Sequence, residues 1–145
     1  MKRPFVWISL LTIVACGVVG AQANLSSDDH AKLMKANAQA AGAMNKAIGS
    51  GAFADARMQV ATLRQNFTSL QAFWADKKKD DALGIVKDGL TRLDALDKIL
   101  GATTVDAMAA QAAAKEFGGN ACGACHKLYR EGDAQTGFRF KPGVL

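Results

Sequence analysis

Two cysteines and a histidine near the C-terminal end of the sequence have a spacing with a specific chemical use. Cys122, Cys125 and His126 form a C-x-x-C-H motif, which is the attachment site of a c-type haem. The two thiols form thioethers with the vinyl groups of one porphyrin, and imidazole is a usual axial ligand of haem iron. On a helix, residues i, i+3 and i+4 share one face, so all three side chains can point at one macrocycle. We therefore expect one covalently bound haem c, with His126 as an axial ligand.

Two other uses of this cysteine pair fit the sequence less well. A thioredoxin-like dithiol requires C-x-x-C at the start of a helix inside a βαβ unit, and no strand pattern surrounds the motif. A structural zinc site requires four ligands at paired spacing, and His30 is far from His126 in the sequence. Haem attachment is the favoured interpretation.

The N-terminal segment has the charge and hydropathy pattern of a signal peptide. Lys2 and Arg3 precede an apolar run from Pro4 to about Val19. Ala21-Gln22-Ala23 then satisfies the small-x-small cleavage rule. We predict that residues 1–23 are a bacterial signal peptide and that the mature protein is periplasmic.

Cys16 offers a second way to process the same segment. Ile13-Val14-Ala15 precedes it and resembles a lipoprotein box, so cleavage there would leave a mature protein anchored through a lipid on Cys16. The simpler rule favours cleavage after Ala23. The apolar run is short for a transmembrane helix, and we expect no membrane span in the mature protein.

The mature chain, residues 24–145, has the size of a single domain. Without Lys2 and Arg3 it carries 16 basic and 13 acidic side chains, a net charge of +3 that two ionised haem propionates would largely cancel. The run Lys77-Lys78-Lys79 is followed by Asp80-Asp81, with no interleaved aromatic residue. This pattern is typical of a solvated loop, so we expect no nucleic acid partner.

The first two expected helices have clear boundaries and apolar faces. Ser26 or Ser27 can cap a helix that extends to about Ile48, and Gly49-Ser50-Gly51 ends it. One face of this helix is formed by Met34, Ala38, Ala41, Met44 and Ile48. The apolar stripe of the second helix is formed by Val60, Leu63, Phe67, Leu70 and Trp74.

A charged loop over residues 76–81 separates these from two more helices. The apolar positions of the third are Leu83, Val86, Leu90, Leu93, Leu96 and Leu100. Thr103 or Thr104 can cap a fourth, which runs from Val105 into the haem motif and can bend at Gly118-Gly119. No strand-type alternation is present. Four helices with three short connections predict an all-α fold, an antiparallel four-helix bundle with haem c on its C-terminal helix.

With the motif on its last helix, the mature chain resembles the cytochrome c-prime family. The best-matched stretch is Cys122–Arg130, and Leu70–Asp76 is also similar. In this family an Arg-x-x-x-apolar pattern on the first helix places its last residue on the distal side of the haem. The matching stretch, His30–Met34, has Met34 at the distal position and His30 in place of the usual Arg. Relatives are often homodimers, so the resemblance implies a possible homodimer.

Met34 determines which function the resemblance implies. As a sixth iron ligand, its thioether would favour ferrous iron and suit outer-sphere electron transfer to redox partner proteins. Met34 can instead be a packing residue like Met44, and His30 can instead be the distal ligand or contact a propionate. We favour a monohaem electron carrier with His126 and Met34 as axial ligands. The alternatives are a five-coordinate, high-spin protein that binds nitric oxide or carbon monoxide, and a subunit of a larger redox complex.

Arg130 and the C-terminal tail are the two remaining features near the motif. Arg130 is one helical turn beyond His126, where a cation near the haem edge would tune the charge around the iron. Residues 131–145 form a tail that is longer than the usual ending of the family and can fold back over the haem edge or over the helices. We expect no enzyme activity, because no set of acid, base and nucleophile is present beyond the haem motif.

Overall fold

The computed structural model describes residues 25–145, so the predicted signal peptide and Cys16 lie outside the described residues. The helical elements are α1 (Ser27–Gly49), α2 (Phe53–Asp76), α3 (Asp80–Leu100), α4 (Ala107–Phe117), the π-helical turn η1 (Gly118–Gly123) and α5 (Ala124–Tyr129). Strands β1 (Arg130–Glu131) and β2 (Arg139–Phe140) add one short ladder. The all-α class is confirmed. No helix within residues 25–145 is long and apolar enough to cross a membrane.

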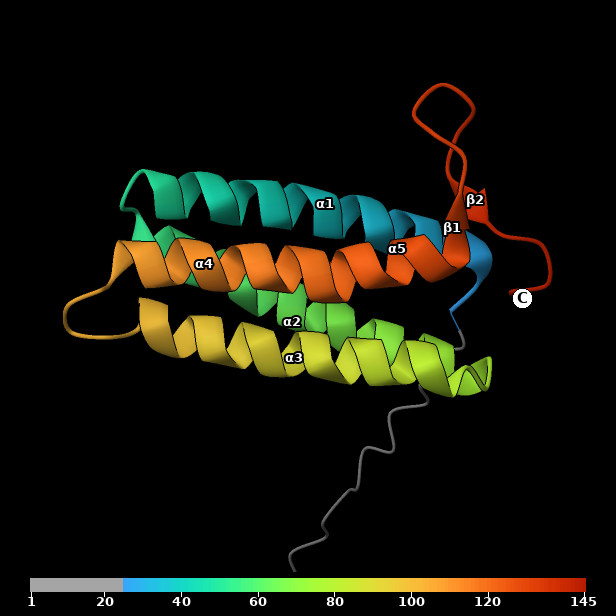
Figure 1. Cartoon of the computed structure of the whole chain (residues 1–145), viewed down its shortest axis with the longest axis horizontal. Coiled ribbons are helices and arrows are strands. Elements are labelled where there is room, and N and C mark those ends of the chain that lie inside the picture. The colour runs from blue at the N-terminus through green and yellow to red at the C-terminus, as the bar shows by residue number, and fades with distance from the viewer. Residues whose placement is uncertain (1–24) are drawn as a thin grey trace, which may run out of the picture.

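The long helices pack side by side around one apolar core (Figure 1). Each consecutive pair is in contact, and α4 also contacts α1. Phe67 on α2 meets Phe117 on α4, with ring centroids 5.2 Å apart, across the middle of the core. All five residues of the predicted α2 stripe are buried. Apolar burial of this kind is the main source of stability in helical domains.

Helix α1 begins where the sequence indicated, and most of its predicted apolar face packs on the core. Ser26 is the N-cap and forms a capping box with Asp29, so two otherwise unpaired backbone N–H groups are satisfied. Ala38 is exposed, whereas Ala40 and Ala47 are buried. Met44 and Ile48 are buried and Met34 and Ala41 pack against the core, so the predicted stripe was wrong only at Ala38.

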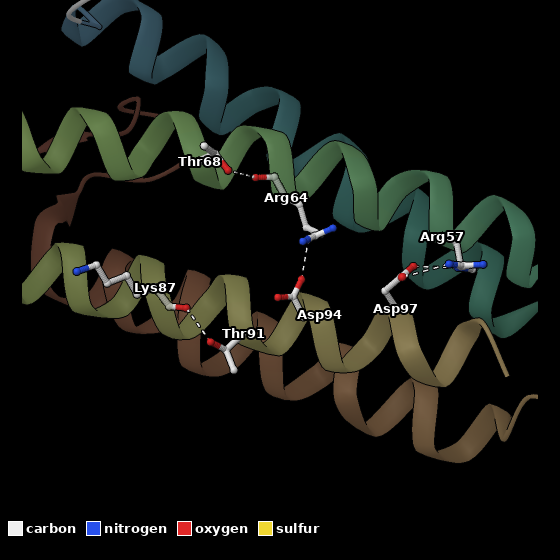
Figure 2. A network of polar contacts seen from close by, with 7 residues as sticks. All are labelled: Arg57, Arg64, Thr68, Lys87, Thr91, Asp94 and Asp97. Atoms are coloured by element: carbon white, nitrogen blue, oxygen red, sulfur yellow. Dashed lines mark hydrogen bonds and ion pairs between the residues drawn. The ribbon is translucent and has the colours of Figure 1, made fainter. Parts of the chain in front are cut away.

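Charged residues on the outer surfaces of α2 and α3 join these helices (Figure 2). Arg57 donates two hydrogen bonds to Asp97, at 2.9 and 3.1 Å, and Arg64 Nε lies 2.8 Å from Asp94 Oδ1. Arg57 precedes Arg64 on α2, whereas their partners have the opposite order on α3, since Asp94 precedes Asp97. Each pair is partly exposed, so water screens it and its contribution to stability is small.

Helix α4 starts two residues later than the sequence indicated. Neither Thr103 nor Thr104 is the cap; Asp106 accepts hydrogen bonds from the backbone N–H groups of Met108 and Ala109. A carboxylate cap also interacts favourably with the positive end of the helix. The prediction of a cap at Thr103 or Thr104 was therefore wrong, and Val105 lies outside the helix.

Helices α4 and α5 form one continuous helical segment through η1 (Figure 1). The bend expected at Gly118-Gly119 is a π-helical turn instead, and the backbone of Gly118 stays in the right-handed helical region. A π turn inside an α-helix accommodates an extra residue without breaking the helix and is frequent at functional sites. The candidate haem motif begins inside this turn, at Cys122.

The tail folds back onto the helices, in agreement with one of its two predicted positions. Arg130 pairs with Phe140 and Glu131 pairs with Arg139 in an antiparallel ladder. These strands were not predicted, because each is only two residues long and carries no alternation pattern. Val144 is buried, so the tail reaches the core.

Gly89 permits the close approach of three helical elements, and its substitution gives a testable prediction. A Cβ atom there would lie 2.6 Å from Phe67 Cε1 and 3.0 Å from the Cβ of Ala121. We expect Gly89→Ala to lower the free energy of unfolding by about 1–3 kcal/mol, measured by urea denaturation, because the core is overpacked. Gly84→Ala is the control: nothing lies within 4 Å of the added atom, so helix propensity should raise stability by up to about 1 kcal/mol. Equal stabilisation by both changes would contradict the packing role of Gly89.

Candidate functional site

The three residues of the C-x-x-C-H motif lie on the inward side of the last helical segment. Cys122 lies in η1, and Cys125 and His126 lie in α5; all three are half-buried. Gly123 and Lys127, between and after them, are exposed. Both cysteines pack against the apolar core. The structure therefore brings the two thiols and the imidazole together on one side of the helix, as the spacing predicted.

The two thiols are in an apolar environment that keeps them protonated. Burial raises the pKa of Cys122. Burial, with Cys122 and the Asp81 carboxylate nearby, raises the pKa of Cys125 to about 11. Dithiols that exchange disulfides have lowered thiol pKa values, because the thiolate is the reactive form. The environment of this pair is the opposite of a thioredoxin-like site.

His126 is suited to bind a metal ion through a neutral ring. Burial and the charge of Arg130 lower the pKa of the His126 imidazole. A neutral imidazole has a nitrogen lone pair available for iron. The chain leaves the helix after Tyr129, and Arg130 is extended and exposed, so it is not on a helical face with His126. Its guanidinium carbon lies 4.2 Å from the ring centroid of Phe138, yet its charge still acts on His126.

Met34 lies on α1, the helix that packs against α4. Its side chain is half-buried and contacts the apolar core. Met44, almost three turns further along α1, is 1% exposed and wholly part of the core. Met58 and Met108 are exposed. Among the methionines within residues 25–145, Met34 is the one that is partly buried; the others are either buried in the core or exposed.

His30, one helical turn before Met34, is enclosed by three aromatic rings, Phe73, Trp74 and Phe140, which we call the aromatic box. The imidazole centroid lies 4.8 Å from the ring of Phe73, 5.8 Å from that of Trp74 and 4.7 Å from that of Phe140. Burial and the charge of His126 lower the pKa of His30 to about 4. His30 is therefore neutral at physiological pH and lies at the same end of the molecule as the haem motif.

The aromatic box was missed in the sequence. Trp74 was expected only as part of the apolar stripe of its helix, and Phe140 belonged to a tail without an assigned function. Trp74 also contacts Tyr129, with ring centroids 4.9 Å apart, so the box continues to the end of α5. Four aromatic residues close to a half-buried histidine could be found only by knowing the fold, since Phe73 and Phe140 are distant in the sequence.

The residues present fit a covalent haem. The donor set contains two thiols and a neutral imidazole on the same helical segment, and a thioether on α1, which contacts the α4 part of that segment. Two buried polar atoms, Asn37 Oδ1 and Asn66 Nδ2, have no hydrogen-bond partner within the described residues, whereas the Tyr129 hydroxyl interacts with the Asp81 carboxylate. Asn37 follows Met34 by one turn. Unpaired buried groups are costly, so they favour a site completed by a polar or ionised group.

A bare metal ion fits this part of the chain less well. Within residues 25–145, no three His, Cys, Asp or Glu side chains are grouped closely enough to hold one. A hollow of about 270 Å³ between α3 and α4 is lined by Asp88, Arg92 and Glu116 among others and contains neither thiol nor imidazole. The half-buried cluster around Cys122 and His126 is the candidate site.

No protein-family model, no curated protein and no solved structure matches this chain. The assignment of the site therefore depends on the motif and its surroundings in this chain.

Proposed function

We propose that this protein is a c-type cytochrome of the cytochrome c-prime class, an exported monohaem electron carrier. Haem c is attached through Cys122 and Cys125, His126 is the proximal ligand and Met34 is the distal ligand. The arrangement of α1 to α5 is, on this proposal, the antiparallel four-helix bundle of that class. When bound, the haem supplies an iron that accepts and releases one electron. The residues of the chain attach it, orient it and limit the access of water.

One observation carries the proposal. Both thiols and the imidazole of the motif lie half-buried on the inward side of one helical segment, and the α4 part of this segment contacts α1, which bears Met34. A cysteine pair with only a structural role, or one at the surface, would not require a histidine next to it on the inward side of the helix. The reversed order of the ion pairs between α2 and α3 supports the antiparallel arrangement.

A six-coordinate iron suits electron transfer because its ligands change little between oxidation states. Met34 packs against the core, which limits its movement. A thioether stabilises ferrous iron and raises the reduction potential relative to two imidazoles. The partners are redox proteins of the periplasm, reached after cleavage of residues 1–23.

Extraction of the purified holoprotein with acidified organic solvent tests the attachment. Haem is expected to stay on the polypeptide, since thioethers survive this treatment. The double variant Cys122→Ala/Cys125→Ala is the control and should release all its haem. Release of haem from the wild type would rule out covalent attachment.

Absorption spectra of the ferric and ferrous holoprotein test the axial ligands. Low-spin ferric iron with a sulfur-to-iron charge-transfer band is expected for His126 and Met34. A high-spin wild type would instead place the protein among those that bind nitric oxide or carbon monoxide at an open site.

A further inference from the structure

The C-terminal hairpin, residues 130–141, is anchored to the end of the helical domain that bears the haem motif. The backbone N–H of Lys141 donates to the carbonyl of Tyr129, at 2.9 Å, and its Nζ donates to the carbonyl of Lys127, at 2.7 Å. The second of these bonds satisfies a carbonyl in the last turn of α5. Beyond the hairpin, Val144 is buried. The hairpin is thus held at several points, and Figure 1 shows it at the α5 end of the molecule.

The two phenylalanines of the hairpin face opposite ways. Phe138 is 57% exposed and contacts Arg130, which is also exposed. Phe140 is half-buried and contacts His30, Phe73 and Trp74. Strand β2 begins at Arg139, so Phe140 belongs to the ladder and Phe138 lies outside it. Phe138 is therefore a matched control for Phe140.

The hairpin supplies the wall of the aromatic box that α2 does not supply. The rings of Phe73 and Phe140 are nearly parallel, with an interplanar angle of 12° and centroids 6.2 Å apart. The imidazole of His30 contacts both. Without Phe140, one side of His30 would be open, and the side chain could adopt other rotamers.

His30 and Met34 are one turn apart on α1, so both are close to the candidate distal side. Imidazole is a strong ligand for haem iron, and a neutral imidazole competes effectively with a thioether. Some other feature of the structure must determine which of the two side chains, His30 or Met34, binds the iron.

We propose that the C-terminal hairpin selects the distal ligand: Phe140 holds His30 in the aromatic box and leaves the iron to Met34. This proposal depends on the haem site proposed above. Phe140 is a positioning residue, since it acts through His30 and does not contact the iron.

Spin state in variants that lack the thioether tests the proposal. Met34→Ala is expected to be high-spin, because His30 stays in the box. Met34→Ala/Phe140→Ala should become low-spin, because the released His30 binds as a second imidazole, and adding His30→Ala should restore the high-spin state. Met34→Ala/Phe138→Ala, the control, should remain high-spin. Electron paramagnetic resonance of the ferric proteins measures each state.

Three outcomes would overturn the proposal. A double variant with Phe140→Ala that stays high-spin would show that Phe140 does not restrain His30. A low-spin control with Phe138→Ala would assign the effect to general loosening of the tail. A low-spin Met34→Ala single variant that becomes high-spin on adding His30→Ala would show that the box does not restrain His30.

A second variant covers the case in which Phe140→Ala does not fold. Phe140→Leu keeps most of the apolar volume but removes the flat ring, and circular dichroism checks its helix content. In the Met34→Ala background it is expected to convert part of the iron to low-spin. Failure of the haem site itself would be recognised separately, because the wild type would then lose its haem on extraction.

Discussion

Met34→Ala is expected to convert the iron from a low-spin, six-coordinate form to a high-spin, five-coordinate form. The methyl group of alanine cannot reach the metal, and the loss of a soft ligand removes its preference for ferrous iron. The reduction potential should therefore fall, and carbon monoxide should bind the ferrous variant readily. In the wild type, carbon monoxide must first displace the thioether, so it should bind slowly or weakly. Absorption spectra and redox titration measure these changes.

Met44→Ala is the matched control for Met34→Ala. Met44 lies on the same helix and is buried in the core, so its truncation should cost about 2–5 kcal/mol of stability. Met34 is only half-buried, and its truncation should cost less, about 1–3 kcal/mol. Met44→Ala should keep the low-spin spectrum despite its larger loss of stability. A Met34→Ala protein with the wild-type spectrum would rule out Met34 as the ligand and point to His30.

His126→Ala is expected to remove the proximal ligand and to prevent stable folding of the holoprotein. Thioethers can still form at Cys122 and Cys125, so some haem should remain on the chain after extraction. The iron would then lack its imidazole, and a half-buried position next to the core would be emptied. Absorption spectra, together with thermal unfolding followed by circular dichroism, measure both effects.

Lys127→Ala is the control for this variant. Lys127 is the next residue and is exposed, so its side chain should be dispensable for the spectrum and for folding. A His126→Ala protein that keeps the wild-type spectrum would show that another side chain is the proximal ligand.

Local sequence signals were sufficient to predict the helices. They also predicted that the cysteines and the histidine of the motif lie on one side of a helix. The stripe from Val60 to Trp74 is regular because every position packs on the core, so periodicity alone identifies it. The cap of α1 was also readable, since Ser26 and Asp29 satisfy each other within one turn. The cap of α4 was not, because threonine and aspartate are both good caps and several stand close together there.

The surroundings of the motif depend on tertiary contacts that no local pattern encodes. Arg130 was expected one turn beyond His126, but pairing with Phe140 draws the chain out of the helix at Tyr129. The aromatic box likewise combines α1, α2 and β2. The position of His30 in the sequence identified it as a candidate. The neutral, enclosed state of its side chain results from the packing of Phe73 and Phe140 around it.

The contact between His30 and Phe140 has a consequence for the order in which the protein assembles. It closes a loop of roughly 110 residues, whereas the contact between His30 and Phe73 closes one of about 43 residues. The difference in closure entropy is only about 0.8 kcal/mol, but the longer loop requires the whole chain to have been synthesised. The α1–α2 wall of the box can therefore form as soon as the first two helices are present. The wall from the hairpin forms last, so the haem motif is available for attachment before the site around His30 is closed.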